Sequence, residues 1–295
     1  MAQPPYTLLV NPSAGGGRTR KLLRAALAAL ADGGIEAREV LTENIEHGRD
    51  EARAAAERGD RVIVMSGDGL IGQVGGALAN TGTVMGIIPG GRGNDLARVL
   101  GIPADVEEAA GIIAAGETRD VDVGEANGAR FLCIASCGFD SEANRIANES
   151  RVRGPLVYAY AALRALAAWK PARFNLTIDG EAVEVVGYTI AAANSKAYGG
   201  GMFIAPDARL DDGLLDVIAI ADGSKVRFLR GLPAVFKGKH IDRDEVSVRR
   251  CRELRIEADR PFSIYADGDP VTELPATIRI LPAALRLIVP PAGAP

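Results

Sequence analysis

Apolar residues in the first part of the chain fall in short runs that alternate with helix-like stretches. Residues 19–34 place Leu23, Ala26 and Leu30 on one helical face and end on glycine. Two further stretches, 49–59 and 94–101, have helical character. The predicted strands are residues 6–10, 37–41, 61–65 and 84–89. This alternation predicts βαβ units and a parallel sheet over about the first 125 residues.

The pattern changes near residue 125. Two hairpin dipeptides follow, Asn127-Gly128 and Asp179-Gly180, and two helical segments, 155–170 and 224–240, interrupt the later strands. Those strands are predicted within residues 184–194, 214–221, 246–258 and 276–281. We therefore predict two domains: an α/β domain of residues 1–125 and an antiparallel β-sandwich or barrel of residues 126–295, with the last residues free to return to the first domain.

Composition narrows the class of protein. The 295 residues are 47% hydrophobic and 24% charged, as in ordinary globular proteins, and the net charge of -4 argues against nucleic acid as a partner. The 3 cysteines form no disulfide or zinc pattern and favour a reducing cytoplasm. The N-terminus does not resemble a signal peptide, and no apolar run is long enough to span a membrane.

Three glycine-rich stretches follow the first, third and fourth predicted strands. They are "NPSAGGGR" (11–18), "SGDGLIG" (66–72) and "PGGRGNDLAR" (89–98). The carboxyl ends of parallel strands share one edge of a sheet, so these loops should converge on one crevice. Glycine lets backbone N–H groups approach an anion, and each loop also opens a helix. One such loop alone is equally well a turn, but three together predict a polyphosphate site.

Two aspartates stand in these loops. Asp68 and Asp95 would supply the hard oxygen ligands that Mg²⁺ needs beside phosphates, although each is also suited to cap a helix. The loops match neither the Walker A pattern nor the dinucleotide GxGxxG pattern. The sequence therefore predicts nucleotide binding by another arrangement.

Seven motifs in order resemble the diacylglycerol kinase catalytic family, which includes bacterial lipid kinases and the sphingosine and ceramide kinases. They are "NPSAGGGR", "MSGDGLIGQV", "GRGNDLAR", "RDVDVG", "CGFDSEAN", "APDARLDDGLLDV" and "YADGDP". "SGDGL" is nearer to the sphingosine and ceramide kinase form of its loop. The resemblance implies a nucleotide-binding α/β domain like those of NAD kinases and phosphofructokinases, an antiparallel β-sandwich, and an active site between them. It also implies ATP and Mg²⁺ as cofactors.

The same resemblance implies roles for individual residues. Eight positions match the nucleotide site of the family: Asn11, Arg18, Gly67, Asp68, Gly69, Gly93, Asn94 and Asp95. We add three expected neighbouring contacts, Thr42, Arg92 and Asp269. An Asp-water-Mg²⁺ network matches Asp68, Asp95 and Asp122, although Asp122 is also typical of a solvated strand residue. A second, structural Mg²⁺ would use Asp212 and the carbonyls of Arg209 and Leu214, where a plain surface turn is the alternative.

The implied general base is Asp267 in "YADGDP", with Asp68 as the alternative base. An Asp-Gly pair by itself is more typical of a hairpin turn. The sequence departs from the family at Leu70, Gly72-Gln73, Arg92 and Asp269, and Arg92 is suited to pair with a phosphate. None of these changes removes Asp68, Asp95 or Asp267, so we expect an active enzyme.

Two segments are candidates for contact with the lipid acceptor. Residues 224–243 mix apolar and basic side chains, which suits an anionic membrane surface, although a helix with a solvated basic face is the alternative. Helix 155–169 would line the acceptor groove or belong to the core, and Trp169 stands where an interfacial anchor could lie. We expect a cytoplasmic protein that reaches the inner face of the membrane, with its oligomeric state open and a homodimer as one option.

These observations lead to one functional hypothesis and two alternatives. The hypothesis is an ATP- and Mg²⁺-dependent lipid kinase that phosphorylates a hydroxyl of a diacylglycerol-like or sphingoid-like acceptor. An NAD kinase-like enzyme is the first alternative, because it shares the Gly-Asp-Gly loop. A nucleotide- or lipid-binding regulator without catalysis is the second, and the altered residues 70–73 are its support.

Overall fold

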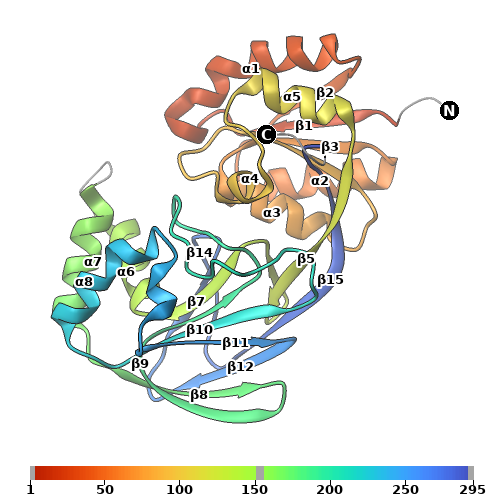
Figure 1. Cartoon of the computed structure of the whole chain (residues 1–295). Helices are drawn as coiled ribbons and strands as arrows, with labels where there is room; N and C mark the ends of the chain where they lie inside the picture. Colours follow the sequence, from red (N-terminus) through yellow and green to blue (C-terminus); the bar gives the residue numbers. More distant parts are fainter. Residues whose placement is uncertain (1–3, 151–155, 292–295) are drawn as a thin grey trace.

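The computed structural model describes residues 4–150 and 156–291, which form two lobes (Figure 1). Residue 155 of the predicted helix 155–170 lies outside the described residues. No helix within the described residues is long and apolar enough to cross a membrane.

The first lobe is built on a parallel sheet in the order β2-β1-β3-β4, as the alternating pattern predicts. Strands β1, β3 and β4 are almost wholly buried, as expected of a sheet covered by helices on both faces. The strands are β1 (Tyr6–Val10), β2 (Ala37–Leu41), β3 (Arg61–Ser66) and β4 (Val84–Pro89). The helices are α1 (Ala14–Asp32), α2 (Ile45–Arg58), α3 (Asp68–Leu78), α4 (Asp95–Leu100) and α5 (Val106–Ala115).

The second lobe is the antiparallel sandwich that the later sequence predicts. Both predicted hairpin pairs are turns with positive φ: Asn127-Gly128 joins β5 to β6, and Asp179-Gly180 joins β8 to β9. Its strands are β5 (Thr118–Ala126), β6 (Ala129–Phe131), β7 (Ile134–Gly138), β8 (Ala172–Ile178), β9 (Glu181–Ala193), β10 (Leu215–Ala221), β11 (Val246–Cys251), β12 (Glu253–Ala258), β13 (Ser263–Ala266), β14 (Asp269–Glu273) and β15 (Ala276–Ile288).

Three helices lie together on the second lobe, away from α1 (Figure 1). They are α6 (Phe139–Glu149), α7 (Leu156–Ala168) and α8 (Lys225–Val235), and a short 3-10 helix, η1 (Lys239–Asp242), follows α8. Aromatic rings join them to the sheet: Phe139 contacts Trp169 and Phe228, and Tyr188 of β9 stacks on Phe228. Trp169 is buried in this cluster, so it is a core residue and not an interfacial anchor.

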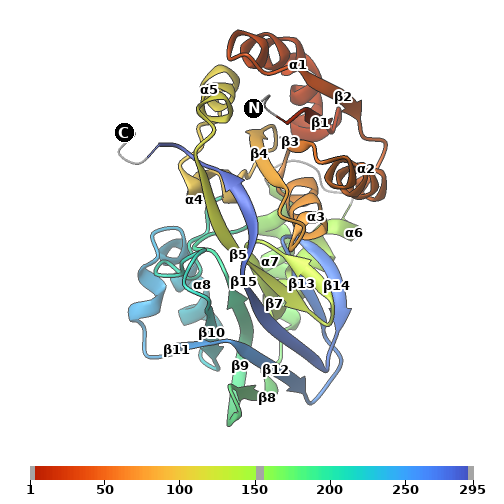
Figure 2. The same ribbon diagram turned by 90° about the vertical axis from the view of Figure 1, so that its right-hand side faces the viewer.

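Strand β15 joins the two lobes (Figure 2). It pairs antiparallel with β12 and β5 over most of its length, and then parallel with β4 at Arg286 and Leu287. The end of the described chain therefore returns to the first lobe. A bulge lies between Leu281 and Leu285, where Ala283 has a φ of 48°. The lobes thus share one continuous sheet.

Candidate active site between the two lobes

Asp68 connects two of the glycine-rich loops. It is the first residue of α3, directly after β3, and its carboxylate accepts hydrogen bonds from the backbone N–H groups of Asn94 (2.7 Å) and Asp95 (2.6 Å). Asn94 has a φ of 52° and also accepts a bond from Gly91 N–H at 2.9 Å. Asp68 therefore caps α4 and not its own helix. Burial, followed by the charge of Asp95, raises the pKa of Asp68.

Asp95 connects the first lobe to the second. Its Oδ1 accepts from Arg98 Nη1 at 2.8 Å, while its Oδ2 accepts from the backbone N–H of Gly200 at 2.7 Å. Gly200 belongs to a tight loop in the second lobe, closed by backbone hydrogen bonds between Tyr198 and Met202. Asp95 is buried, with only 4% of the residue exposed. It is therefore held at the boundary of the lobes.

Asp267 occupies the Asp-Gly turn between β13 and β14, with a φ of 50°. Its Oδ2 accepts from Leu132 N–H at 2.7 Å, and its Oδ1 accepts from Cys133 N–H at 2.9 Å and Ile134 N–H at 3.2 Å. Burial raises the pKa of Asp267 to about 6 despite these donors, and the charge of Asp68 adds to the rise. The residue is thus both a hairpin turn and a carboxylate with an unusual pKa.

The structure brings Asp68, Asp95 and Asp267 together. All line one cavity of about 710 Å³, with Arg92 and Cys133 beside them. Their sequence positions are far apart, and two of them come from the first lobe while the third comes from the second. Three carboxylates from separate parts of the sequence therefore line the same cavity.

Two glycines allow this close approach. A Cβ atom on Gly72 would lie 2.8 Å from Asp267 Oδ2, and one on Gly93 would lie 2.7 Å from Asp68 Oδ2. Both distances are shorter than side-chain packing permits, so the backbone itself forms the floor beside each carboxylate. Gly72, one of the departures from the family pattern, leaves the space that Asp267 occupies.

Some predicted nucleotide contacts lie near this centre. The Arg92 guanidinium lies 3.9 Å from the place of a Cβ on Gly16, so it stands against the first glycine loop as well as the cavity. Asp269 Oδ2 lies 3.7 Å from the corresponding place on Gly69, and burial raises the pKa of Asp269. Gly67 packs against Gly91, which brings the second and third loops into contact.

Other predicted contacts are engaged within the protein. Asn11 Oδ1 accepts from Ser13 N–H at 3.0 Å, and the exposed Arg18 donates to the Ala104 carbonyl at 3.3 Å. Thr42 is buried, and its hydroxyl donates to the Val10 carbonyl at 3.1 Å. The Thr42 side chain therefore fastens β2 to β1 and does not line the cavity.

Asp122 does not join Asp68 and Asp95. It is buried in β5, where its Oδ2 accepts from Gly213 N–H and its Oδ1 from Ala283 N–H, each at 2.7 Å. These bonds fix the bulge of β15 and the loop of residues 209–214. The alternative expectation of a solvated strand residue is wrong, because Asp122 is buried.

The loop that contains Arg209, Asp212 and Leu214 has some features of a cation site. Asp212 Oδ1 accepts from Leu214 N–H at 3.1 Å, and Asp216 next to the loop is buried with its Oδ2 lacking a partner. Burial raises the pKa of Asp216, and the charge of Asp212 adds to it. Across residues 4–150 and 156–291 no group of three or more His, Cys, Asp or Glu side chains is arranged to hold a metal. A cation here would need carbonyl ligands.

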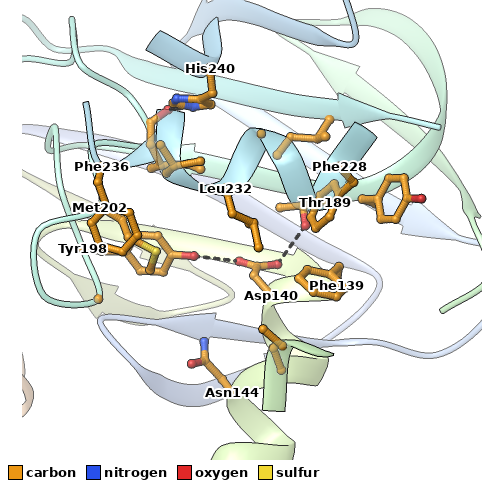
Figure 3. Close-up of a pocket in the computed structure, with 18 of the residues that line it drawn as sticks. Phe139, Asp140, Asn144, Thr189, Tyr198, Met202, Phe228, Leu232, Phe236 and His240 are labelled. Atoms are coloured by element: carbon orange, nitrogen blue, oxygen red, sulfur yellow. Dashed lines mark hydrogen bonds between the residues drawn. The ribbon is translucent and has the colours of Figure 1, made fainter. Parts of the chain in front are cut away.

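The rest of the cavity is largely apolar (Figure 3). Helix α8 supplies Phe228, Leu232 and Val235, whereas α7 supplies Ala162 among the described side chains. On α7, Leu166 is buried and Leu163 is exposed. Helix α8 therefore contributes more described side chains to the cavity than α7, the helix for which this role was predicted.

Three polar residues of this wall escaped the sequence analysis. Asp140, Thr189 and Tyr198 lie around the middle of the apolar part (Figure 3). Asp140 stands two residues after the end of β7, within the motif "CGFDSEAN", and an acid in that position was the available signal. Tyr198 and Thr189 carried no signal, because only tertiary structure brings them to Asp140.

Comparison with known proteins agrees with this geometry. Residues 5–126 match the diacylglycerol kinase catalytic domain, and residues 133–289 match the YegS C-terminal NAD kinase beta sandwich-like domain. A diacylglycerol kinase of Mycobacterium tuberculosis is 38% identical to the chain over 97% of this chain and 96% of its own. The chain belongs to the diacylglycerol kinase catalytic family.

Other family members are more distant. A diacylglycerol kinase of Bacillus subtilis is 27% identical over 96% of this chain and 95% of its own. A crystal structure from Bacillus anthracis str. Sterne has a TM-score of 0.82 at 25% identity, with 98% of both chains covered. The protein is thus a lipid kinase of the diacylglycerol kinase family.

Proposed function

We propose that the protein transfers the γ-phosphoryl group of ATP to the hydroxyl group of a lipid, with diacylglycerol as the acceptor and Mg²⁺ as the metal. One observation carries the proposal: carboxylates from both lobes line one cavity whose remaining wall is largely apolar. A kinase must neutralise the negative charge of the phosphates, and it must hold the attacking hydroxyl in line with the γ-phosphorus and away from water. The names of the relatives support diacylglycerol as the acceptor.

Asp267 is the general base in this proposal. It lies on the second lobe, on the same side as the apolar wall, and three backbone N–H groups fix its orientation. A carboxylate has about four acceptor sites, so one remains for the hydroxyl proton. With a pKa of about 6, the group is ionised at neutral pH yet basic enough to accept that proton. The hydroxyl oxygen then bonds to the γ-phosphorus, and ADP leaves with the bridging oxygen.

Asp68 and Asp95 act on the phosphate side. Asp68 orders the loop of residues 91–95 through two backbone hydrogen bonds, and that loop is one of the three glycine-rich cradles. Asp68 and Asp95 are the carboxylates that would hold Mg²⁺, with water and phosphate oxygens as its other ligands, and the bound ion would neutralise charge on the phosphates. The other proposed nucleotide contacts are Asn11, Arg18, Gly67, Gly69, Arg92 and Gly93. Asp269 would lie near the ribose or the metal. Asp68 is therefore a positioning and metal-side residue in this scheme.

A second Mg²⁺ is proposed at residues 209–214. The partnerless Asp216 Oδ2, the neighbouring Asp212 and the Asp122 carboxylate beside Gly213 support a cation there. Such an ion would stabilise the junction of the lobes and would not touch the reacting atoms.

Helix α8 is the proposed contact with the membrane. Val226 and Leu229 are exposed on it, close to Lys225 and Arg230 in the sequence, and Phe236 follows at its end. Apolar and basic side chains on one exposed segment suit an anionic lipid surface. The opposite face of the same helix lines the cavity, so a lipid would have a short path inward.

The test is product identification. The purified protein would be incubated with γ-labelled ATP, Mg²⁺ and mixed vesicles containing diacylglycerol, with NAD⁺ present as a competing acceptor. Label in phosphatidate, lost on chelation of Mg²⁺, is the expected result. Label in NADP⁺, or ATP binding without any labelled lipid, would contradict the proposal.

A further inference from the structure

A link of two residues, Leu132 and Cys133, joins β6 to β7 and holds the carboxylate of Asp267. The three backbone N–H groups of residues 132–134 all donate to that carboxylate, and Asp267 N–H donates in return to the Ile134 carbonyl at 3.1 Å. The link belongs to neither strand, so no ladder of the sheet fixes the direction of its peptide groups. Other contacts must therefore set where its N–H groups point.

Asn194, directly after β9, supplies those contacts. Its Nδ2 donates to the Leu132 carbonyl at 2.8 Å, and its backbone N–H donates to the Cys133 carbonyl at 2.8 Å. Ser195 N–H adds a second bond to the Cys133 carbonyl at 3.1 Å. Asn194 Nδ2 also donates to the Asp122 carbonyl at 2.9 Å, which ties the link to β5. Asn194 thus holds both carbonyl groups of the link.

The same peptide groups contact Asn194 on one side and Asp267 on the other. The Leu132 carbonyl and the Cys133 N–H belong to one peptide group, and the Cys133 carbonyl and the Ile134 N–H belong to the next. In a planar trans peptide the C=O and N–H bonds point in opposite directions, so a fixed carbonyl also aims the N–H. Hydrogen bonds in such a chain polarise one another as well. Asn194 therefore acts on both amides that hold Oδ1 of Asp267.

The orientation of the Asn194 amide follows from its neighbours. A flipped amide would set its oxygen against the carbonyls of Asp122 and Leu132, so the nitrogen must face them. Asn194 is 0% exposed, and within the described part of the chain its Oδ1 has no hydrogen-bond partner. A buried acceptor without a partner is costly. The two N–H donors are thus the feature that this position keeps despite that cost.

We propose that Asn194 is a positioning residue for phosphoryl transfer: its side-chain amide and backbone N–H hold the link of residues 132–133 so that the Asp267 carboxylate stays aimed at the attacking hydroxyl. This inference rests on the proposed role of Asp267 as the base and goes beyond it by adding a residue behind the cavity wall. Because Asn194 has no exposed surface, it cannot touch the nucleotide or the lipid. Its effect must pass through Asp267.

Asn194→Leu tests this role by removing the amide from a side chain of similar size. The kcat should fall about ten- to a hundredfold, because a small displacement of a catalytic group is that costly, while the KM for ATP stays unchanged. Thr7→Val is the matched control. It removes a hydroxyl that is equally buried and donates to Asp60 at 2.8 Å, but Thr7 lies in β1 and does not line the cavity. This control should lose stability and keep its kcat.

A double variant separates positioning from a general loss of packing. Asp267→Asn removes the group through which Asn194 acts, so adding Asn194→Leu to it should change kcat by less than about twofold. The decrease in melting temperature caused by Asn194→Leu should persist in the double variant. A further drop in kcat as large as in the wild-type background would overturn the proposal. If Asn194→Leu does not fold, Asn194→Ser takes its place, because it removes the amide with a smaller side chain.

Amide NMR spectra give a measurement that does not depend on activity. In Asn194→Leu the amide protons of Cys133 and Ile134 should shift upfield as their bonds to Asp267 weaken, and Thr7→Val should leave both unchanged. Unchanged shifts in Asn194→Leu, or shifted resonances with wild-type kcat, would overturn the positioning role and leave the kinase proposal intact. If the wild-type enzyme labels no lipid, the proposed function fails, and the same shifts still show whether Asn194 orients the amides that hold Asp267.

Discussion

Two Asp-Gly turns in the second lobe share their local structure but differ in their surroundings. Asp179 and Asp267 both have positive φ, at 46° and 50°, and both carboxylates accept bonds from backbone N–H groups. Asp179 lies at the exposed edge of the sandwich, whereas Asp267 faces the cavity between the lobes with a pKa of about 6. The same dipeptide thus makes the same turn, and burial between the lobes is what raises the pKa of Asp267.

The strongest test exchanges each acid for its amide. Asp267→Asn should lower kcat by a factor on the order of 10² to 10⁴, since an amide cannot take the hydroxyl proton. Asp179→Asn should leave kcat unchanged. Steady-state assays with diacylglycerol as the acceptor measure kcat for both variants. The KM for ATP serves as a check on nucleotide binding. An Asp267→Asn enzyme with full turnover would remove Asp267 from the role of base.

A smaller effect is expected from the space beside Asp267. Gly72→Ala places a Cβ 2.8 Å from Asp267 Oδ2 and should displace that carboxylate, lowering kcat about ten- to a hundredfold. Gly111→Ala in α5 is the control, because no atom lies within 4 Å of its added Cβ. Equal activity of the two alanine variants would mean that the close approach at Gly72 does not matter.

The pH profile separates the two turns further. Loss of the proton from Asp267 should produce a rise in kcat/KM up to a pH of about 6 and a plateau above it. A profile that stays flat between about pH 5 and 7 would contradict the assignment of the base.

Stability should depend on pH in the opposite sense. The folded-state pKa of Asp267 is raised from 3.8, so the folded protein binds this proton more tightly than the unfolded chain does. Its contribution to stability is fully present below pH 3.8 and is lost as the pH rises through about 6. Chemical denaturation over this range would measure the effect, with Asp267→Asn as the reference.

The smallest expected difference between the two turns is in the free energy of unfolding of their asparagine variants. At neutral pH, Asp267→Asn removes the cost of a buried charge, which should offset the weakened bonds to the N–H groups of Leu132, Cys133 and Ile134 and leave the free energy of unfolding nearly unchanged. Asp179→Asn weakens charge-assisted bonds to the N–H groups of Arg252 and Glu253, so it should lower that free energy by about 1 kcal/mol. Urea denaturation of the two variants compares these values directly. Destabilisation of both to the same extent would show that the turns are energetically alike.

Much of this fold was predictable because it depends on local patterns. The buried strands, the glycine loops and the hairpin dipeptides each carry a signal within about ten residues, and the ordered motifs identified the family. Leu70 shows how a departure is absorbed: it is buried in the core, where it packs over Gly48. The sequence shows that Leu70 departs from the family pattern, but it does not show that the leucine side chain is accommodated in the core.

The parts that could not be predicted depend on contacts between distant segments. Asp122 has the same appearance in the sequence as a metal ligand or a solvated residue, and the amides of Gly213 and Ala283 alone decide its role. Asp140 and Tyr198 meet only because β7, β9 and the loop after β9 converge. Trp169 resembles a surface anchor until the rings of Phe139 and Tyr188 enclose it.

Strand β15 has a consequence for the order of folding during synthesis. Residues near 286 supply the outer partner of β4, which itself ends at Pro89. About two hundred residues must therefore leave the ribosome before the first sheet gains its neighbour. Until then the edge of β4 that later pairs with β15 has unpaired backbone N–H and C=O groups. Such an edge can pair with strands of other chains and promote aggregation. The nascent first lobe is expected to depend on helper proteins, or on slow translation, to a degree that its compact final form does not suggest.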